Sequence, residues 1–221
     1  MRNFILIFLL VFVSFSSFGA TQRFFQDAKL PTQQMVEKQS FINPAAAGDN
    51  DVLSSFTGNT SGAAATATTF VAQPDVPRVL VLVVDQSADD LADCTVTVTG
   101  TNFFDQLITQ TYTFAANASG SQTSSKAFKS VTSVSFPALC EDSPYGATWS
   151  LGFGEALGIK RCMGADGDFL HSTLNGAKEA TAPTIVSDSD EVEKNIVDFN
   201  GAMNGSNDFN LFFFQNYGCH P

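Results

Sequence analysis

Basic side chains and histidine are scarce in this sequence of 221 residues. It holds 11 Lys and Arg against 22 Asp and Glu, for a formal net charge of −11, and only two histidines. A surface of that sign repels phosphate backbones and anionic headgroups, which argues against nucleic-acid binding and peripheral membrane binding. With so little histidine and no C-x-x-C pair, the common zinc sites are excluded. We therefore expect neither a metal nor a cofactor.

Familiar catalytic patterns are missing as well. No Gly-x-Ser-x-Gly, phosphate-binding P-loop or His-Glu-x-x-His sequence occurs. The glycines of Gly152–Gly158 lack flanking β-α-β alternation, so we predict a turn at a strand end there. His171 lies in HSTLNG, which indicates an exposed loop rather than a Ser-His-Asp site. The acidic runs Asp85–Asp93, Asp166–Asp168 and Asp188–Glu193 lack EF-hand spacing and are interpreted as solvated loops. We predict that the protein is not an enzyme.

The N-terminus has the pattern of an export signal. Arg2 is followed by the apolar run Phe4–Phe15, and small residues at Ser17 and Gly19 precede Ala20. We predict that residues 1–19 are a signal peptide, with a retained hydrophobic anchor as the alternative. Contact with a membrane is expected only if this segment is retained.

Four cysteines follow the predicted signal: Cys94, Cys140, Cys162 and Cys219. An even number of cysteines in an exported chain predicts one or two disulfides. Three pairings of four cysteines exist, and the sequence does not choose among them.

The fold class is predicted from short alternating runs. Residues 20–76 are interpreted as an extended or partly helical N-terminal arm and linker. A short helix is predicted in TQQMVEKQS. At residues 58–69 a linker is favoured over a buried strand. From residue 77 onward the pattern changes. The strands expected there lie at Arg78–Asp85, Cys94–Asn102, Leu107–Phe114, Thr132–Phe136, YGATWSLGF, TAPTIV and FNLFFFQNY. Residues 77–221 are therefore predicted to form an all-β domain, an antiparallel β-sandwich of Ig-like or jelly-roll-like type.

The stretch SSKAFKSVTSVSF changes its apolar period halfway. Phe128 and Val131 are three residues apart, whereas Val134 and Phe136 are two apart. All four can face one core only if a helical turn or a β-bulge near Ser130 absorbs a residue. We predict such a turn or bulge and place these four side chains in the core.

Several of these segments, taken in order, resemble a widespread family of tailed-bacteriophage structural proteins. The similarity is carried by PRVLVLVV, CTVTVTGTNFFDQLITQTYTF, SSKAFKSVTSVSF, WSLGFGEALGI and NGSNDFNLFFF. Members of that family have a K-A-F-K-x-V-T-S-[IV] strand, and Lys126–Val134 is the strongest match. The similarity runs from Pro77 to Ile159 and resumes at Asn204.

This resemblance implies a non-enzymatic virion protein, such as a capsid decoration, spike or tail-associated subunit. Its expected partners are other virion subunits, including copies of itself, and its expected location is the virion. The alternative, based on the export signal and the cysteines, is a secreted bacterial adhesin or glycan-binding module that contacts a host-surface glycan. In the first case Leu211–Tyr217 is an interface candidate, although an ordinary buried strand is favoured.

Overall fold

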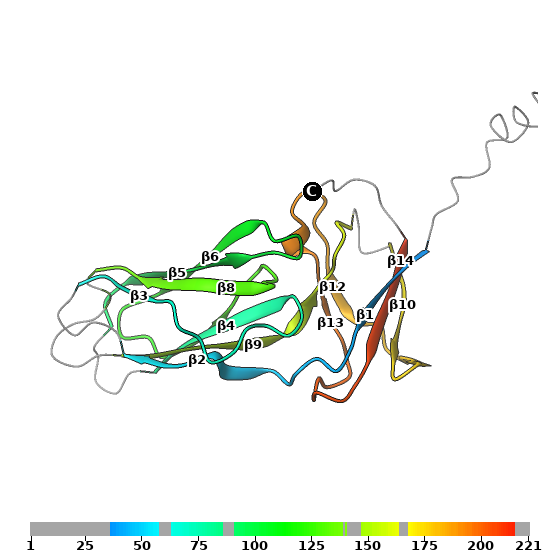
Figure 1. The fold of residues 1–221 in the computed structure, drawn as a ribbon, viewed down its shortest axis with the longest axis horizontal. Coiled ribbons are helices and arrows are strands. Elements are labelled where there is room, and N and C mark those ends of the chain that lie inside the picture. The colour runs from blue at the N-terminus through cyan, green and yellow to red at the C-terminus, as the bar shows by residue number, and fades with distance from the viewer. Residues whose placement is uncertain are drawn as a thin grey trace, which may run out of the picture. The chain divides into compact units, whose positions relative to one another are not determined.

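The computed structural model describes residues 36–57, 63–85, 91–138, 140, 147–163 and 168–214. These residues are arranged in antiparallel sheets and contain no α-helix (Figure 1). The strands are β1 (Val36–Phe41), β2 (Gly48–Thr57), β3 (Ala65–Ala67), β4 (Arg78–Asp85), β5 (Cys94–Thr101), β6 (Leu107–Phe114), β7 (Gly120–Thr123), β8 (Ser130–Phe136), β9 (Thr148–Gly158), β10 (Phe169–Leu174), β11 (Ala177–Lys178), β12 (Thr184–Val186), β13 (Ile196–Asp198) and β14 (Phe209–Phe214).

Two of the sheets form the predicted sandwich. Sheet B has the order β12-β13-β9-β4-β7, with β2 also paired to β9, and sheet C has the order β3-β8-β5-β6. Side chains that alternate along these strands meet between the sheets and form the first core. Trp149 of β9 lies at its centre, with ring centroids 5.3 Å from both Phe114 and Phe136 of sheet C. The all-β sandwich expected from the sequence is confirmed.

A third sheet encloses the second core. Sheet A has the order β1-β14-β10-β11 and buries Phe41, Phe209, Leu211 and Phe213. These residues pack with the far end of β9, with β13 and with the loops that follow them. The expected strand at the C-terminal FNLFFF is therefore present, and its alternate residues are buried. The last three residues of the proposed interface segment, 215–217, lie outside the described residues.

A bulge accounts for the change of period in SSKAFKSVTSVSF. Thr99 of β5 pairs with Ser133 of β8, whereas Gly100 pairs with Val131, so Thr132 is an extra residue in β8. Ahead of the strand, Phe128 bridges to Arg78 of β4. The four predicted core residues, Phe128, Val131, Val134 and Phe136, are all buried in the first core.

Residues 36–76 differ from the arm and linker that the sequence indicated. The predicted helix in TQQMVEKQS is wrong within the described part, because Val36–Phe41 is strand β1 and pairs with β14. The favoured linker at 58–69 contains β3, which pairs with β8 and buries Ala67. Both strands pair with partners distant in sequence, and such partners leave no local signal. The preceding residues, including the predicted export signal, lie outside the described ranges.

The glycines of Gly152–Gly158 lie inside strand β9 and not in a turn, so that prediction is wrong. A Cβ atom on Gly152 would clash with the backbone of Gly48, and one on Gly154 would clash with Val79. These glycines allow β2 and β4 to approach β9 more closely than any side chain would permit.

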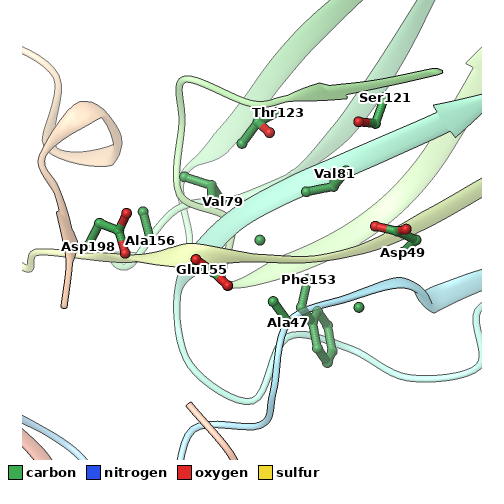
Figure 2. Close-up of a pocket in the computed structure, with 12 residues that line it drawn as sticks. Ala47, Asp49, Val79, Val81, Ser121, Thr123, Phe153, Glu155, Ala156 and Asp198 are labelled. Atoms are coloured by element: carbon green, nitrogen blue, oxygen red, sulfur yellow. The ribbon is translucent and has the colours of Figure 1, made fainter. Parts of the chain in front are cut away.

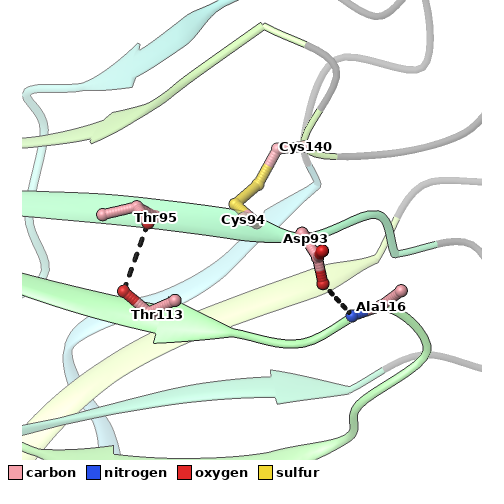
Figure 3. The surroundings of a disulfide bond; sticks show 6 residues. All are labelled: Asp93, Cys94, Thr95, Thr113, Ala116 and Cys140. Atoms are coloured by element: carbon pink, nitrogen blue, oxygen red, sulfur yellow. Dashed lines mark hydrogen bonds between the residues drawn. A yellow bond between two sulfur atoms is a disulfide. The ribbon is translucent and has the colours of Figure 1, made fainter.

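One disulfide joins Cys94, at the start of β5, to Cys140 in the segment after β8 (Figure 3). Beside it, the Ala116 amide donates a hydrogen bond of 2.8 Å to Asp93. Cys162 is also disulfide-bonded, and Cys219 lies outside the described residues. A disulfide of this kind is typical of exported or extracellular proteins. Among the described residues, no helix is long and apolar enough to cross a membrane.

Candidate functional site

The histidine considered from the sequence belongs to a strand and not to a loop. His171 lies in β10, where its ring stacks on Phe212 of β14 with centroids 4.4 Å apart. The turn in HSTLNG begins only at Asn175 and Gly176, which both have positive φ and connect β10 to β11. The His171 side chain therefore belongs to a sheet face.

The acidic run at Asp188–Glu193 is committed to ion pairs. Lys126 contacts Glu191 at 3.0 Å and Glu193 at 3.2 Å. Burial opposes the charge on Lys126, but the two carboxylates raise the pKa of its ammonium group. Glu193 also accepts a hydrogen bond from Asn102. These contacts hold the turn at Val192–Lys194 against the sandwich. The acidic run therefore stabilises the fold and is not an open binding site.

A hollow of 540 Å³ lies on the outer side of sheet B (Figure 2). Gly48 of β2 and Gly154 of β9 form part of its lining. Val79 and Val81 of β4 contribute apolar surface, and Ser121 and Thr123 of β7 contribute hydroxyl groups. A site of this size falls within the range of ligand-binding and docking cavities.

Three carboxylates line this hollow, which we call the acidic hollow: Asp49 of β2, Glu155 of β9 and Asp198 of β13. Figure 2 shows Glu155 between the other two. Its described lining contains no lysine, arginine or histidine. Burial raises the pKa of Asp198, and repulsion from Glu155 raises it further. A second hollow of 200 Å³ shares Glu155 and Asp198 with the first.

A buried cation beside the acidic hollow attracts Glu155 but forms its described ion pair with Asp75. Arg78 is fully buried, and its guanidinium group donates two hydrogen bonds to the Gly154 carbonyl, at 2.6 and 3.0 Å. It also contacts Asp75 at 3.2 Å and lies 4.9 Å from the Phe153 ring centroid. Burial lowers the pKa of Arg78, and Asp75 partly offsets this effect. The Arg78 charge is thus used in holding β4, β9 and the loop before β2 together.

The outer face of sheet A has the opposite charge. Cross-strand pairing aligns its side chains in three rows. The first row is Val36 and Phe214, and the second is Lys38, Phe212 and His171. The third row is Ser40, Asn210, Thr173 and Lys178. No carboxylate occupies these cross-strand positions in the described strands.

This outer face is also partly apolar. Val36 is 53% exposed, and Phe212 and Phe214 are only half-buried. The ammonium group of Lys38 lies 5.9 Å from the Phe212 ring centroid, a cation–π arrangement that leaves the lysine exposed. Aromatic side chains are enriched at protein–protein interfaces.

The sequence indicated part of one surface, because the interface candidate Leu211–Tyr217 contains Phe212 and Phe214, but it did not predict the acidic hollow. Asp49, Glu155 and Asp198 come from three separate strands, and the sheet face joins strands from the two ends of the described chain. For the hollow, the available signal was the spacing of glycines in GFGEALG, because glycine inside a strand indicates close backbone approach. Among the described residues, no three His, Cys, Asp or Glu side chains converge closely enough to hold a metal ion. No family model, curated protein or solved structure matches the chain.

Proposed function

We propose that the chain is a non-enzymatic structural subunit of a bacteriophage virion, acting as a capsid decoration, spike or tail-associated protein. The observation that supports this proposal is where the phage-like segments lie in the fold. PRVLVLVV, the TVTVTGT hairpin, the KAFKSVTSV stretch and GFGEALG correspond to β4, β5 with β6, β8 and β9. Together these strands supply most of the first core. Four of the five matching segments therefore lie in one packed unit, and the fifth, NGSNDFNLFFF, supplies β14 of the second core.

The surfaces described above are consistent with a role in assembly. One large aromatic and cationic sheet face and one acidic hollow offer area and charge for contacts with other subunits. Residues 1–19 are proposed to direct export, and the Cys94–Cys140 disulfide agrees with an oxidising environment. A virion subunit with these features would be incorporated during or after an export step.

Mass spectrometry of purified particles tests the proposal. Particles would be banded on a density gradient, treated with a protease to remove adhering protein, and digested under reducing conditions. We expect peptides from Pro77–Ile159 in a fixed ratio to the major capsid protein across successive gradients. Particles that lack the polypeptide, while the particle-free culture fluid contains it, would contradict a virion role.

The second candidate function is a secreted adhesin or glycan-binding module. The acidic hollow favours it, because carboxylates and the hydroxyl groups of Ser121 and Thr123 are suitable partners for sugar hydroxyls. A glycan array probed with the purified chain tests this function. Binding that is lost in Glu155→Gln, and retained in the distant Asp105→Asn variant, would support it.

A further inference from the structure

We propose that copies of this chain associate head to tail, with the outer face of sheet A of one copy seated over the acidic hollow of the next. The inference deepens the proposed function and rests on it, since it names the contact by which such a subunit would bind another copy. The two surfaces belong to different sheets, so the contact is heterologous.

Charge complementarity carries this inference. The charged and titratable side chains in the rows of the sheet A face are Lys38, His171 and Lys178, and all of them are basic. The charged side chains of the hollow are all carboxylates. These rows thus hold two lysines and no carboxylate, in a chain with 22 acidic and 11 basic residues. Among the described surfaces, the acidic hollow of a second copy is therefore a partner of opposite charge for the sheet face.

The electrostatic state of the hollow also favours a cationic occupant. Glu155 and Asp198 repel each other at a partly desolvated position whose described lining contains no cation, and the buried Arg78 nearby attracts Glu155 while it is ion-paired with Asp75. An ammonium group brought in by Lys38 of another copy would remove this repulsion. The gain is larger there than on an open surface, because the surrounding protein lowers the local dielectric constant.

Apolar contacts would add to the charge pairing. Val36, Phe212 and Phe214 lie on the same sheet face as Lys38, and Val79 and Val81 line the hollow. Covering exposed aromatic surface stabilises an interface by roughly 25 cal/mol per Å² before the costs of association. Because the contact is heterologous, repeated copies produce either a closed ring or an open filament.

Charge reversal tests the contact in the purified chain. Sedimentation velocity at low and at 0.5 M salt, at roughly 10 to 100 µM protein, gives the assembly state, and salt is expected to weaken it by screening. We expect Lys38→Glu and Glu155→Lys each to raise the concentration needed for assembly by about tenfold or more. The double variant, Lys38→Glu with Glu155→Lys, should restore assembly. An equimolar mixture of the two single variants should also assemble, because each hollow then finds a face of opposite charge.

The matched controls are Lys129→Glu and Asp105→Lys, which reverse an ion pair at the β5–β6 turn. They make the same charge changes away from both surfaces and should leave assembly unchanged. Fluorescence of the single Trp149 checks that every variant is folded.

Three results would overturn the inference. The first is a wild-type chain that stays monomeric at low salt. The second is a Glu155→Lys variant that assembles like the wild type while Lys38→Glu does not, which would indicate a face-to-face contact of sheet A. The third is a double variant that fails to recover. These outcomes are separate from the particle test, since a chain present in virions can still be monomeric, and an assembling chain can be absent from them.

Discussion

The two hydrophobic cores draw on different parts of the chain. Most of the first core comes from residues 80–153. Its strands β5 and β6 form a hairpin, whereas β4 pairs with β9 and β5 with β8 across intervening strands. The second core is closed by β1 and β14, whose paired residues Val36 and Phe214 are separated by nearly the whole described sequence. The first core thus comes mainly from the middle of the chain, and the second depends on bringing together the two ends of the described sequence.

The two cores are also held together differently. The first has the Cys94–Cys140 disulfide and two aromatic rings packed at steep angles against Trp149, and disulfide-bonded Cys162 precedes Met163 of the second. The second is closed by buried polar groups, among them Gln39, which donates to the Gly158 carbonyl at 2.8 Å and accepts from the Lys160 amide. Strand β9 contributes to both cores, since Trp149 packs in the first and Leu157 in the second. We infer that the cores unfold together, despite their different construction.

Removing a buried ring from either core gives the largest expected effect. Phe128→Ala in the first core and Phe213→Ala in the second should each lower the free energy of unfolding by about 3 to 5 kcal/mol. Urea unfolding followed by Trp149 fluorescence and by far-UV circular dichroism measures both. Phe212→Ala is the matched control, because Phe212 lies on the outer side of the same strand and should cost much less.

The comparison between the cores would change if Phe213→Ala shifted only the circular dichroism transition. In that case Trp149 would report a first core that stays folded after the second has opened. Coincident shifts with both probes would establish one cooperative unit.

The disulfide should contribute nearly as much as a buried ring. Cys94 and Cys140 are 46 residues apart, and chain-entropy estimates give roughly 4 kcal/mol for a loop of that length. Cys94→Ala with Cys140→Ala should therefore lower the free energy of unfolding by about 2 to 4 kcal/mol, measured by urea denaturation without reductant. A change below about 1 kcal/mol would mean that the first core is held by packing alone.

Asn195 is expected to be the most costly polar residue to remove. It is fully buried beside the second core, where its side-chain oxygen accepts from the Met163 and Asp188 amides and its nitrogen donates to the Asp188 and Glu191 carbonyls. Asn195→Ala leaves these groups unpaired and should cost about 1 to 3 kcal/mol.

Hydrogen exchange should show faster exchange at the Met163 and Asp188 amides of the Asn195→Ala variant than in the wild type. Asn200→Ala is the control, because Asn200 is exposed and also donates to two carbonyls. Equal costs for the two variants would argue that the polar groups beside the second core are as well solvated as surface groups.

How much of the fold the sequence reveals depends on how local the signal of each strand is. Strands β5 and β6 were predicted because each alternates within one short stretch. The bulge in β8 was predicted because four apolar residues must share one core. Strands β1 and β3 were not, since VEKQSF and ATA acquire their strand character from distant partners.

The candidate surfaces were less predictable than the fold. Alternation shows which side chains of one strand share a face, but it does not show which strands lie side by side. Lys38 and Lys178, on opposite edge strands, come to share one face only through β14 and β10. Similarly, Asp198 meets Glu155 only because the short β13 pairs with the end of β9. Lys126 likewise meets Glu191 and Glu193 only in the folded chain.

The smallest expected effect is a gain in stability and not a loss. It distinguishes the carboxylates of the acidic hollow from the carboxylates that form ion pairs around sheet A. Burial, together with repulsion from Glu155, raises the pKa of Asp198, so the folded chain binds this proton more tightly than the unfolded chain does. Ionisation of Asp198 therefore costs stability as pH rises through its folded pKa. Asp198→Asn should therefore raise the melting temperature at pH 7. The gain in the free energy of unfolding should be less than about 1 kcal/mol, because the group is partly solvated. This gain should disappear below about pH 4, where Asp198 is protonated in the wild type.

Glu37→Gln is the contrasting control for that measurement. Burial opposes its ionisation, but hydrogen bonds from Lys160 and Arg161 lower the pKa of Glu37, so its stabilisation is present at neutral pH and is lost as pH falls through the folded pKa. The variant should thus be less stable than the wild type at pH 7 and equal to it in acid. If both variants changed stability in the same direction at pH 7, the hollow would not be a site of unrelieved negative charge, and the case for a cationic partner there would fail. Opposite signs would show that the carboxylate at the second core already has its cations, whereas those of the hollow still lack one.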